Sequence, residues 1–135
     1  MIHMKVVVAS GKRKSAVARA TVKKGQGLVR INNVPVEIFE PHLAKVMVME
    51  PLTLAGDRSG KVDIDVNVSG GGVIGQANAS RTAIAKGLVQ FLQDDELQAL
   101  YVKYDRSLLV SDPRRKLPKN PQGRGARKKH QKSYR

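Results

Sequence analysis

Apolar and polar residues alternate along several segments of the chain, and this two-residue period predicts β-strands. In residues 61–69 every second residue is Val or Ile, so one face of this strand is buried and the other faces water. Residues 15–22 place Ala or Val at every second position, and residues 5–9 precede them as another apolar strand. The intervening residues 11–14, with the sequence GKRK, are predicted to form the turn between these two strands.

Two further short apolar segments, residues 28–31 and 34–38, flank Asn32 and Asn33. Asn tolerates positive φ, so a two-residue Asn-Asn connection predicts a β-hairpin. Because Pro35 has no amide hydrogen, its strand is expected to be short or to lie at an edge of the sheet.

Helical patterns occupy much of the remaining sequence. One helix is predicted to begin at Pro41 and to be interrupted at Pro51, where a backbone donor is missing. Residues 73–93 place apolar residues on one side, and their many Ala and Gly residues make a thin helix that can approach a sheet closely.

A last helix is predicted at about residues 95–104, with Asp94 or Asp95 as its N-cap. The order of elements predicts an α+β fold: a mostly antiparallel sheet of about four or five strands, with helices packed on one face. Hydrophobic residues make up 41% of the chain and aromatic residues only 4%, so the core is expected to be aliphatic. The absence of Cys excludes disulfides, thiolate nucleophiles and Cys-containing zinc sites.

Positive charge is concentrated at the two ends of the chain, whose formal net charge is +14. Residues 1–30 contain 8 basic and no acidic residues, residues 31–111 contain 7 basic and 10 acidic residues, and residues 112–135 contain 10 basic and 1 acidic residue. This distribution favours a polyanionic partner, nucleic acid before a membrane surface. No apolar segment approaches the roughly 18–20 residues of a membrane span, and the first apolar run is too short for a secretory signal. We therefore expect a cytosolic protein.

The charge distribution also predicts the domain organisation: a globular α+β domain that binds nucleic acid, residues 1–111, and an extended basic tail, residues 112–135, although charge alone does not choose RNA over DNA. The tail contains three Pro, two Gly and few apolar residues. It cannot offset its own ordering entropy and is expected to be disordered when free. Spaced basic residues with Gly and Pro suit threading between phosphates.

A glycine-rich segment, residues 70–75 (GGGVIG), matches G-x-G-x-x-G between a predicted strand and a helix. Three interpretations are open: a purely structural tight turn, a contact with a nucleic-acid phosphate, and a nucleotide cofactor site. A dinucleotide site also needs a second parallel strand ending in an acidic residue, but Asp94 and Asp95 lie between two predicted helices. We expect no cofactor.

The titratable residues form no catalytic or metal-binding pattern. His3, His42 and His130 are scattered without metal-ligand spacing. Asp63 and Asp65 share one strand face as a general acid/base pair could, but solvated charges on a half-buried strand are the commoner reason for such alternation. We expect that the protein is not an enzyme and has no small-molecule substrate.

Four stretches of the chain resemble the small-subunit ribosomal protein nine family, and the match covers nearly the whole length. They are residues 10–19 (SGKRKSAVAR); residues 29–33 (VRINN); residues 70–77 (GGGVIGQA) with 79–81 (ASR) and 84–85 (IA); and residues 112–116 (DPRRK) with 125–127 (GAR) and 131–135 (QKSYR). The Ser-Tyr-Arg ending resembles the archaeal and eukaryotic branch, and the short amino end is typical of archaeal members. Tyr134 stands where bacterial members have Lys, so one charge beside the terminal Arg is missing.

The resemblance implies a structural constituent of the small ribosomal subunit, located in the cytoplasmic ribosome. Its partners would be ribosomal RNA of the head region, neighbouring ribosomal proteins and, through the tail, peptidyl-site tRNA. The residues implied to bind ribosomal RNA are Lys12, Arg13, Lys14, Arg19, Gly71, Gly72, Gln76, Arg81, Arg114, Arg115, Lys116, Arg124, Arg127, Lys128 and Lys129. The residues implied to lie near tRNA are Lys132, Tyr134 and Arg135.

Other functions remain open on the sequence alone. The cluster at residues 12–14 could be a solvated turn, although residues 1–30 contain no acidic residue to neutralise it. The same basic ends would also suit a non-specific nucleic-acid-compacting protein acting outside the ribosome. A nucleotide-dependent enzyme is a third and weaker alternative.

Overall fold

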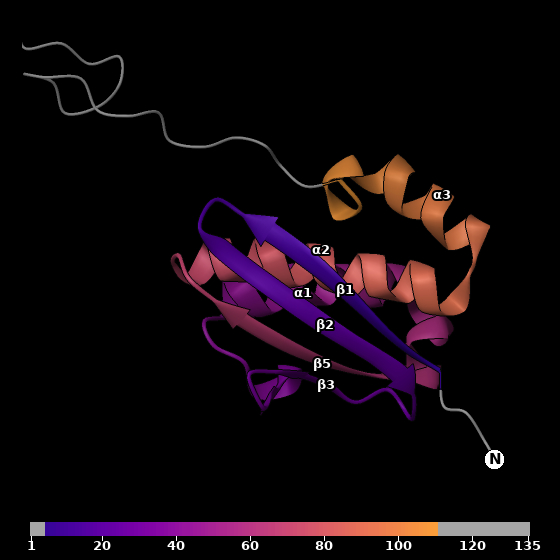
Figure 1. The fold of residues 1–135 in the computed structure, drawn as a ribbon, viewed down its shortest axis with the longest axis horizontal. Coiled ribbons are helices and arrows are strands. Elements are labelled where there is room, and N and C mark those ends of the chain that lie inside the picture. The colour runs from indigo at the N-terminus through magenta and orange to yellow at the C-terminus, as the bar shows by residue number, and fades with distance from the viewer. Residues whose placement is uncertain (1–4, 111–135) are drawn as a thin grey trace, which may run out of the picture.

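The computed structural model describes residues 5–110, which form a five-stranded mixed sheet with helices on one face (Figure 1). The strands are β1 (Val6–Arg13), β2 (Ala16–Lys24), β3 (Val29–Ile31), β4 (Val34–Pro35) and β5 (Val62–Ser69). The helices are α1 (His42–Ala55), α2 (Val73–Leu92) and α3 (Asp95–Tyr104). Short 3-10 segments are η1 (Val36–Ile38), η2 (Gly56–Lys61) and η3 (Arg106–Leu108). The predicted α+β class is confirmed, whereas the predicted tail lies outside the described residues.

The sheet has the strand order β1-β2-β5-β3-β4. Only the β3–β5 pairing is parallel, so the sheet is mostly antiparallel, as predicted. The Asn32-Asn33 hairpin is confirmed, with φ of 50° and 68° at the two residues. Its second strand is only Val34–Pro35, because Pro35 cannot donate to a longer ladder and the chain continues into η1. Figure 1 shows α1 and α2 behind the sheet and α3 beyond its β1 edge.

The core is aliphatic and lies between the sheet and α2. Ala16, Ala18, Ala20 and Val22 of β2 are all fully buried, as the alternation predicted. In the described chain, Tyr101 is the single aromatic residue in the core, and its hydroxyl donates to the Pro51 carbonyl oxygen at 2.7 Å. Burial raises the pKa of Tyr101, so the hydroxyl stays protonated.

The predicted turn at residues 11–14 is wrong, because β1 continues to Arg13 and only Lys14 and Ser15 form the connection. Gly11 pairs with Ala18 in the sheet and lies directly against α2. A Cβ at Gly11 would meet the Ala79 carbonyl oxygen and lie 2.7 Å from the Ala83 nitrogen. This glycine therefore permits close packing between strand and helix rather than a turn.

The predicted interruption at Pro51 is also wrong, because α1 continues to Ala55. Ala44, Val48, Pro51 and Ala55 are the buried residues of α1, and their spacing places them on one helix face. Packing of this face offsets the missing hydrogen bond at Pro51. The third helix agrees with the prediction: the Asp94 carboxylate caps it by accepting from the Glu96 and Leu97 amides at 3.0 and 3.3 Å.

Gly11→Ala tests the close packing of α2 on β1. The added methyl group meets helix backbone, which cannot move aside as a side chain can, so we expect a loss of about 1–3 kcal/mol in unfolding free energy. Urea denaturation followed by circular dichroism measures it. Gly60→Ala is the control, since a Cβ there has no neighbour within 4 Å. Equal stabilities of the two variants would show that the packing is looser than described.

The loop between β2 and β3 is held by the Asp63 carboxylate, which accepts from the Gln26 and Leu28 amides at 3.0 Å each. These backbone hydrogen bonds lower the pKa of Asp63 below its usual 3.8, and the hydrogen bond from Gln26 has the largest effect. Because the pKa is lower in the folded state, the contribution to stability is present above pH 3.8 and is lost as the pH falls through the folded-state value. The loop therefore weakens in acid.

Asp63→Asn removes this titration, so we expect the stability difference between wild type and variant to be largest near neutral pH and to shrink as the pH falls below 3.8. Denaturant titrations at several pH values measure it, with Asp57→Asn, at an exposed carboxylate of η2, as the control. A difference that is independent of pH would contradict the assignment.

Candidate nucleic-acid interface

The end of the β1–β2 hairpin brings together the first predicted basic cluster. Arg13 pairs with Ala16 in the last ladder position, and Lys14 has φ of 54° in the turn. Lys12, Lys14 and Arg19 are exposed, while Arg13 is half-buried on the side of the sheet that faces the helices. The structure therefore places three of these four cations in solvent at one end of the molecule.

Lys12 and Arg19 are exposed at strand positions next to the buried Gly11 and Ala18, so they lie on the face of the sheet that α1 and α2 leave uncovered (Figure 1). Lys12 is opposite Val17, and Arg19 lies between Ser10 and Asn67 in the neighbouring strands, so no acidic residue faces either cation across the sheet. These two charges are available to an external polyanion.

The far end of the same open face is electrically balanced. Arg30 Nε forms an ion pair with Asp65 Oδ1 at 3.0 Å. Lys23 is opposite Asp63 in the β2–β5 register, and its charge helps to lower the pKa of that carboxyl. Asp63 and Asp65 thus have structural partners, and the open face carries its net positive charge at the hairpin end.

The predicted glycine-rich loop lies against the hairpin turn. Gly70 and Gly71 have φ of 79° and 67°, and a Cβ at Gly71 would lie 3.3 Å from the Ala16 nitrogen. Gly72 is the N-cap residue of α2, and no side chain caps the helix there. Gln76 donates through Nε2 to the Gly70 carbonyl oxygen at 3.2 Å, which closes the loop on itself.

An exposed helix N-terminus beside cationic side chains suits a phosphate, because unpaired amides and the positive end of the helix dipole attract anions. A dinucleotide site would need a second parallel strand after α2, but in the described chain α2 leads directly into α3 and no strand follows β5.

No metal site is found among the described residues. His42 is the first residue of α1, and residues 5–110 contain no group of three or more metal-ligating side chains.

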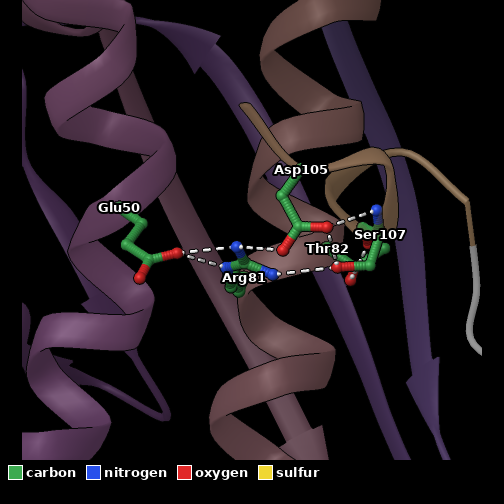
Figure 2. A network of polar contacts seen from close by, with 5 residues as sticks. All are labelled: Glu50, Arg81, Thr82, Asp105 and Ser107. Carbon is green, nitrogen blue, oxygen red and sulfur yellow. Dashed lines mark hydrogen bonds and ion pairs between the residues drawn. The ribbon is translucent and has the colours of Figure 1, made fainter. Parts of the chain in front are cut away.

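Arg81 differs from the other predicted RNA-binding residues because its side chain is only 10% exposed. Figure 2 shows its guanidinium between Glu50 of α1 and Asp105, which precedes η3. Nη2 lies 2.6 Å from Glu50 Oε2 and 3.0 Å from Asp105 Oδ2. Burial alone would raise the pKa of the Asp105 carboxyl, but hydrogen bonds from Ser107 and Arg81 together with the Arg81 charge lower it. The Arg81 charge is thus shared by two carboxylates within the fold.

A polar hollow of about 410 Å³ separates the hairpin from η3. Its lining residues are Lys12, Arg13, Asn78, Arg81, Thr82, Asp105 and Ser107. The sequence alone did not predict Asn78, Thr82, Asp105 or Ser107 as site residues. Asn78 and Thr82 are four residues apart, so they share a face of α2. The Asp-x-Ser sequence at 105–107 is typical of a local cap. Neither pattern indicates that these two segments lie opposite each other across the hollow.

The remaining predicted site residues lie outside the described residues. They are Arg114, Arg115, Lys116, Arg124, Arg127, Lys128, Lys129, Lys132, Tyr134 and Arg135. Within residues 5–110, none of the helices has the combination of length and apolar character needed to cross a membrane.

Comparison with known proteins gives the family. The family model of ribosomal protein S9/S16 matches residues 11–135. Small ribosomal subunit protein uS9 of Thermoplasma volcanium is 56% identical over 132 residues, covering 98% of this chain and 100% of that protein. The protein of the same name from Methanothrix thermoacetophila has the same identity and coverage, and that from Picrophilus torridus is 50% identical over 129 residues, covering 96% of this chain and 97% of that protein. These archaeal relatives confirm the resemblance seen in the four sequence stretches, and the chain belongs to the ribosomal protein S9/S16 family.

Proposed function

We propose that the chain binds small-subunit ribosomal RNA of the head region through the hairpin end and the neighbouring N-terminus of α2. Membership of a ribosomal protein family makes the chain a structural component of the ribosome rather than an enzyme. The observation that carries the RNA proposal is the unbalanced charge of Lys12 and Arg19 on the open sheet face, in contrast to the paired Arg30.

We further propose that residues 112–135 extend this contact along the RNA and bring Lys132, Tyr134 and Arg135 toward peptidyl-site tRNA. This segment contains 10 basic residues and 1 acidic residue, so it can neutralise many phosphates. A folded body bound to RNA keeps a tethered segment at high local concentration near one place, so weak contacts by the segment become effective.

Neutralising Lys12 and Arg19 tests the hairpin surface. For the double variant Lys12→Gln, Arg19→Gln we expect weaker binding to a transcript of the small-subunit rRNA head domain. The slope of log K against log salt should become shallower by about 0.7–0.9 for each phosphate that the variant no longer neutralises. Filter binding across a series of KCl concentrations measures both quantities.

The matched control is Lys23→Gln, Arg30→Gln, which removes the same charge from the balanced end of the same sheet face. We expect this control to keep a salt slope near that of wild type. If both double variants reduce the slope equally, the hairpin end is not the RNA-binding surface and only net charge matters.

The tRNA contact is tested at the end of the chain. The sequence contains no Cys, so Ser133→Cys gives one attachment point for an iron chelate that cleaves nearby RNA. In assembled small subunits we expect cleavage in the anticodon stem-loop of bound peptidyl-site tRNA. Arg135→Ala should weaken tRNA binding only about fivefold, the effect of one exposed charge contact. A cleavage pattern that spares tRNA altogether would refute the proposal for the tail.

A further inference from the structure

Arg81 joins three elements that are distant in sequence. Its Nε donates to Glu50 Oε2 of α1 at 2.7 Å, its Nη2 to Asp105 Oδ2 at 3.0 Å, and its Nη1 to Ser107 Oγ of η3 at 3.2 Å. We call Arg81, Glu50, Asp105 and Ser107 the Arg81 clasp (Figure 2).

The Asp105 side chain uses its two oxygens for different purposes. Oδ1 accepts from the Ser107 amide at 2.9 Å and from Ser107 Oγ at 2.8 Å, which shapes the start of η3. Oδ2 accepts from Arg81 and attaches this turn to α2. Thr82 Oγ1 adds a hydrogen bond to the Ser107 carbonyl oxygen at 3.3 Å. The segment that ends the described chain is therefore held against the side of α2 by polar contacts.

Arg81 is buried, whereas the Glu50 and Asp105 side chains are partly exposed, at 30% and 42%. Ion pairs to a buried charge contribute little net stability relative to an apolar replacement, and their best-attested role is to select one geometry. The geometry selected here holds η3 against α2. Asp105 and Ser107 line the same hollow as Lys12 and Arg13, and the described chain ends at Val110, shortly beyond them. Residues 112–135, with their 10 basic residues, follow from this point.

We infer that Arg81 is a positioning residue: the Arg81 clasp fixes the origin of the basic tail beside the basic hairpin, so that the two cationic ends of the chain act on RNA as one surface. The inference rests on the proposed RNA-binding function and deepens it. It assigns Arg81 an intramolecular role that differs from the direct RNA contact implied by the family resemblance. A fixed origin raises the local concentration of the tail at the RNA that the hairpin binds and lowers the ordering cost of binding.

Asp105→Asn tests the inference because the clasp and the net charge predict opposite changes in affinity for RNA. The Asn side-chain oxygen can still accept from Ser107 at the start of η3, while the amide group placed toward Arg81 cannot attract the guanidinium. The variant has one negative charge fewer, so electrostatics alone predicts tighter binding to the rRNA head-domain transcript. The clasp predicts the opposite, a weakening of about threefold to tenfold, as expected when two sites are no longer coupled.

Asp57→Asn is the matched control, because it removes the same charge from an exposed site outside the clasp and should leave RNA binding unchanged or tighter. Glu50→Gln, on the other side of Arg81, is a second clasp variant and should weaken binding as Asp105→Asn does. Circular dichroism at the assay temperature shows that each full-length variant is folded. If both clasp variants bind as tightly as Asp57→Asn, the inference is wrong.

A tail-dependent readout separates positioning from direct contact by Arg81. In a full-length background with Arg114→Gln, Arg115→Gln and Lys116→Gln, we expect Asp105→Asn to have little remaining effect on RNA affinity. The first basic residues of the tail, which the clasp would position, can no longer bind phosphate in that background. An iron chelate on Ser111→Cys should cleave a confined region of the transcript in the wild-type background and a wider region with Asp105→Asn. An unchanged cleavage pattern would overturn the inference even if affinity fell.

The experiment also separates failure of the inference from failure of the proposed function. If the wild-type chain does not bind the transcript, or Lys12→Gln, Arg19→Gln has no more effect than its control, the RNA proposal itself fails. If those results hold and only the clasp variants behave like Asp57→Asn, the RNA proposal stands without the clasp.

Discussion

The close approach of α2 to the sheet is the constraint on which the rest of the structure depends. A Cβ at Gly11 would collide with the helix backbone, and a Cβ at Gly87 would lie 2.6 Å from Val22 Cγ2. Small residues therefore bring the two layers together and leave a core of mainly Ala, Val, Ile and Leu with little room for rings. This closeness also positions the two parts of α2 to which we assign a role: its N-terminus beside the hairpin turn, and Arg81 between α1 and η3.

A strand period of two residues produces the core and the cationic surface together. Ala18 and Ala20 of β2 face the helices, and Arg19 between them faces solvent. The sheet then decides which exposed charges are balanced, because register places Asp63 and Asp65 beside Lys23 and Arg30 but leaves Arg19 between uncharged neighbours. The positive end of the open face thus arises from strand pairing as much as from composition.

Arg19 and Arg81 show why the candidate site could be predicted only in part. Both residues lie in stretches that resemble the family, and nothing in their local sequence distinguishes an exposed arginine from a buried one. The partners of Arg81 lie 31 and 24 residues away, at Glu50 and Asp105, so no sequence window contains the ion pairs. A buried guanidinium with two carboxylates has a different role from one in solvent, because its charge is already compensated.

The sequence by itself determined what depends on near neighbours: the alternating strands, the Asn32-Asn33 hairpin, the Asp94 cap and the excess of cations at the two ends. These features follow from backbone preferences and hydrogen bonds within a few residues. Only the tertiary structure decided that Gly11 belongs to a strand and that α1 passes through Pro51, because packing against distant residues outweighs the local signal at both positions. The parallel pairing of β3 with β5 and the burial of Arg81 were likewise decided by the tertiary structure, since contacts between segments far apart in the chain leave no local pattern in the sequence.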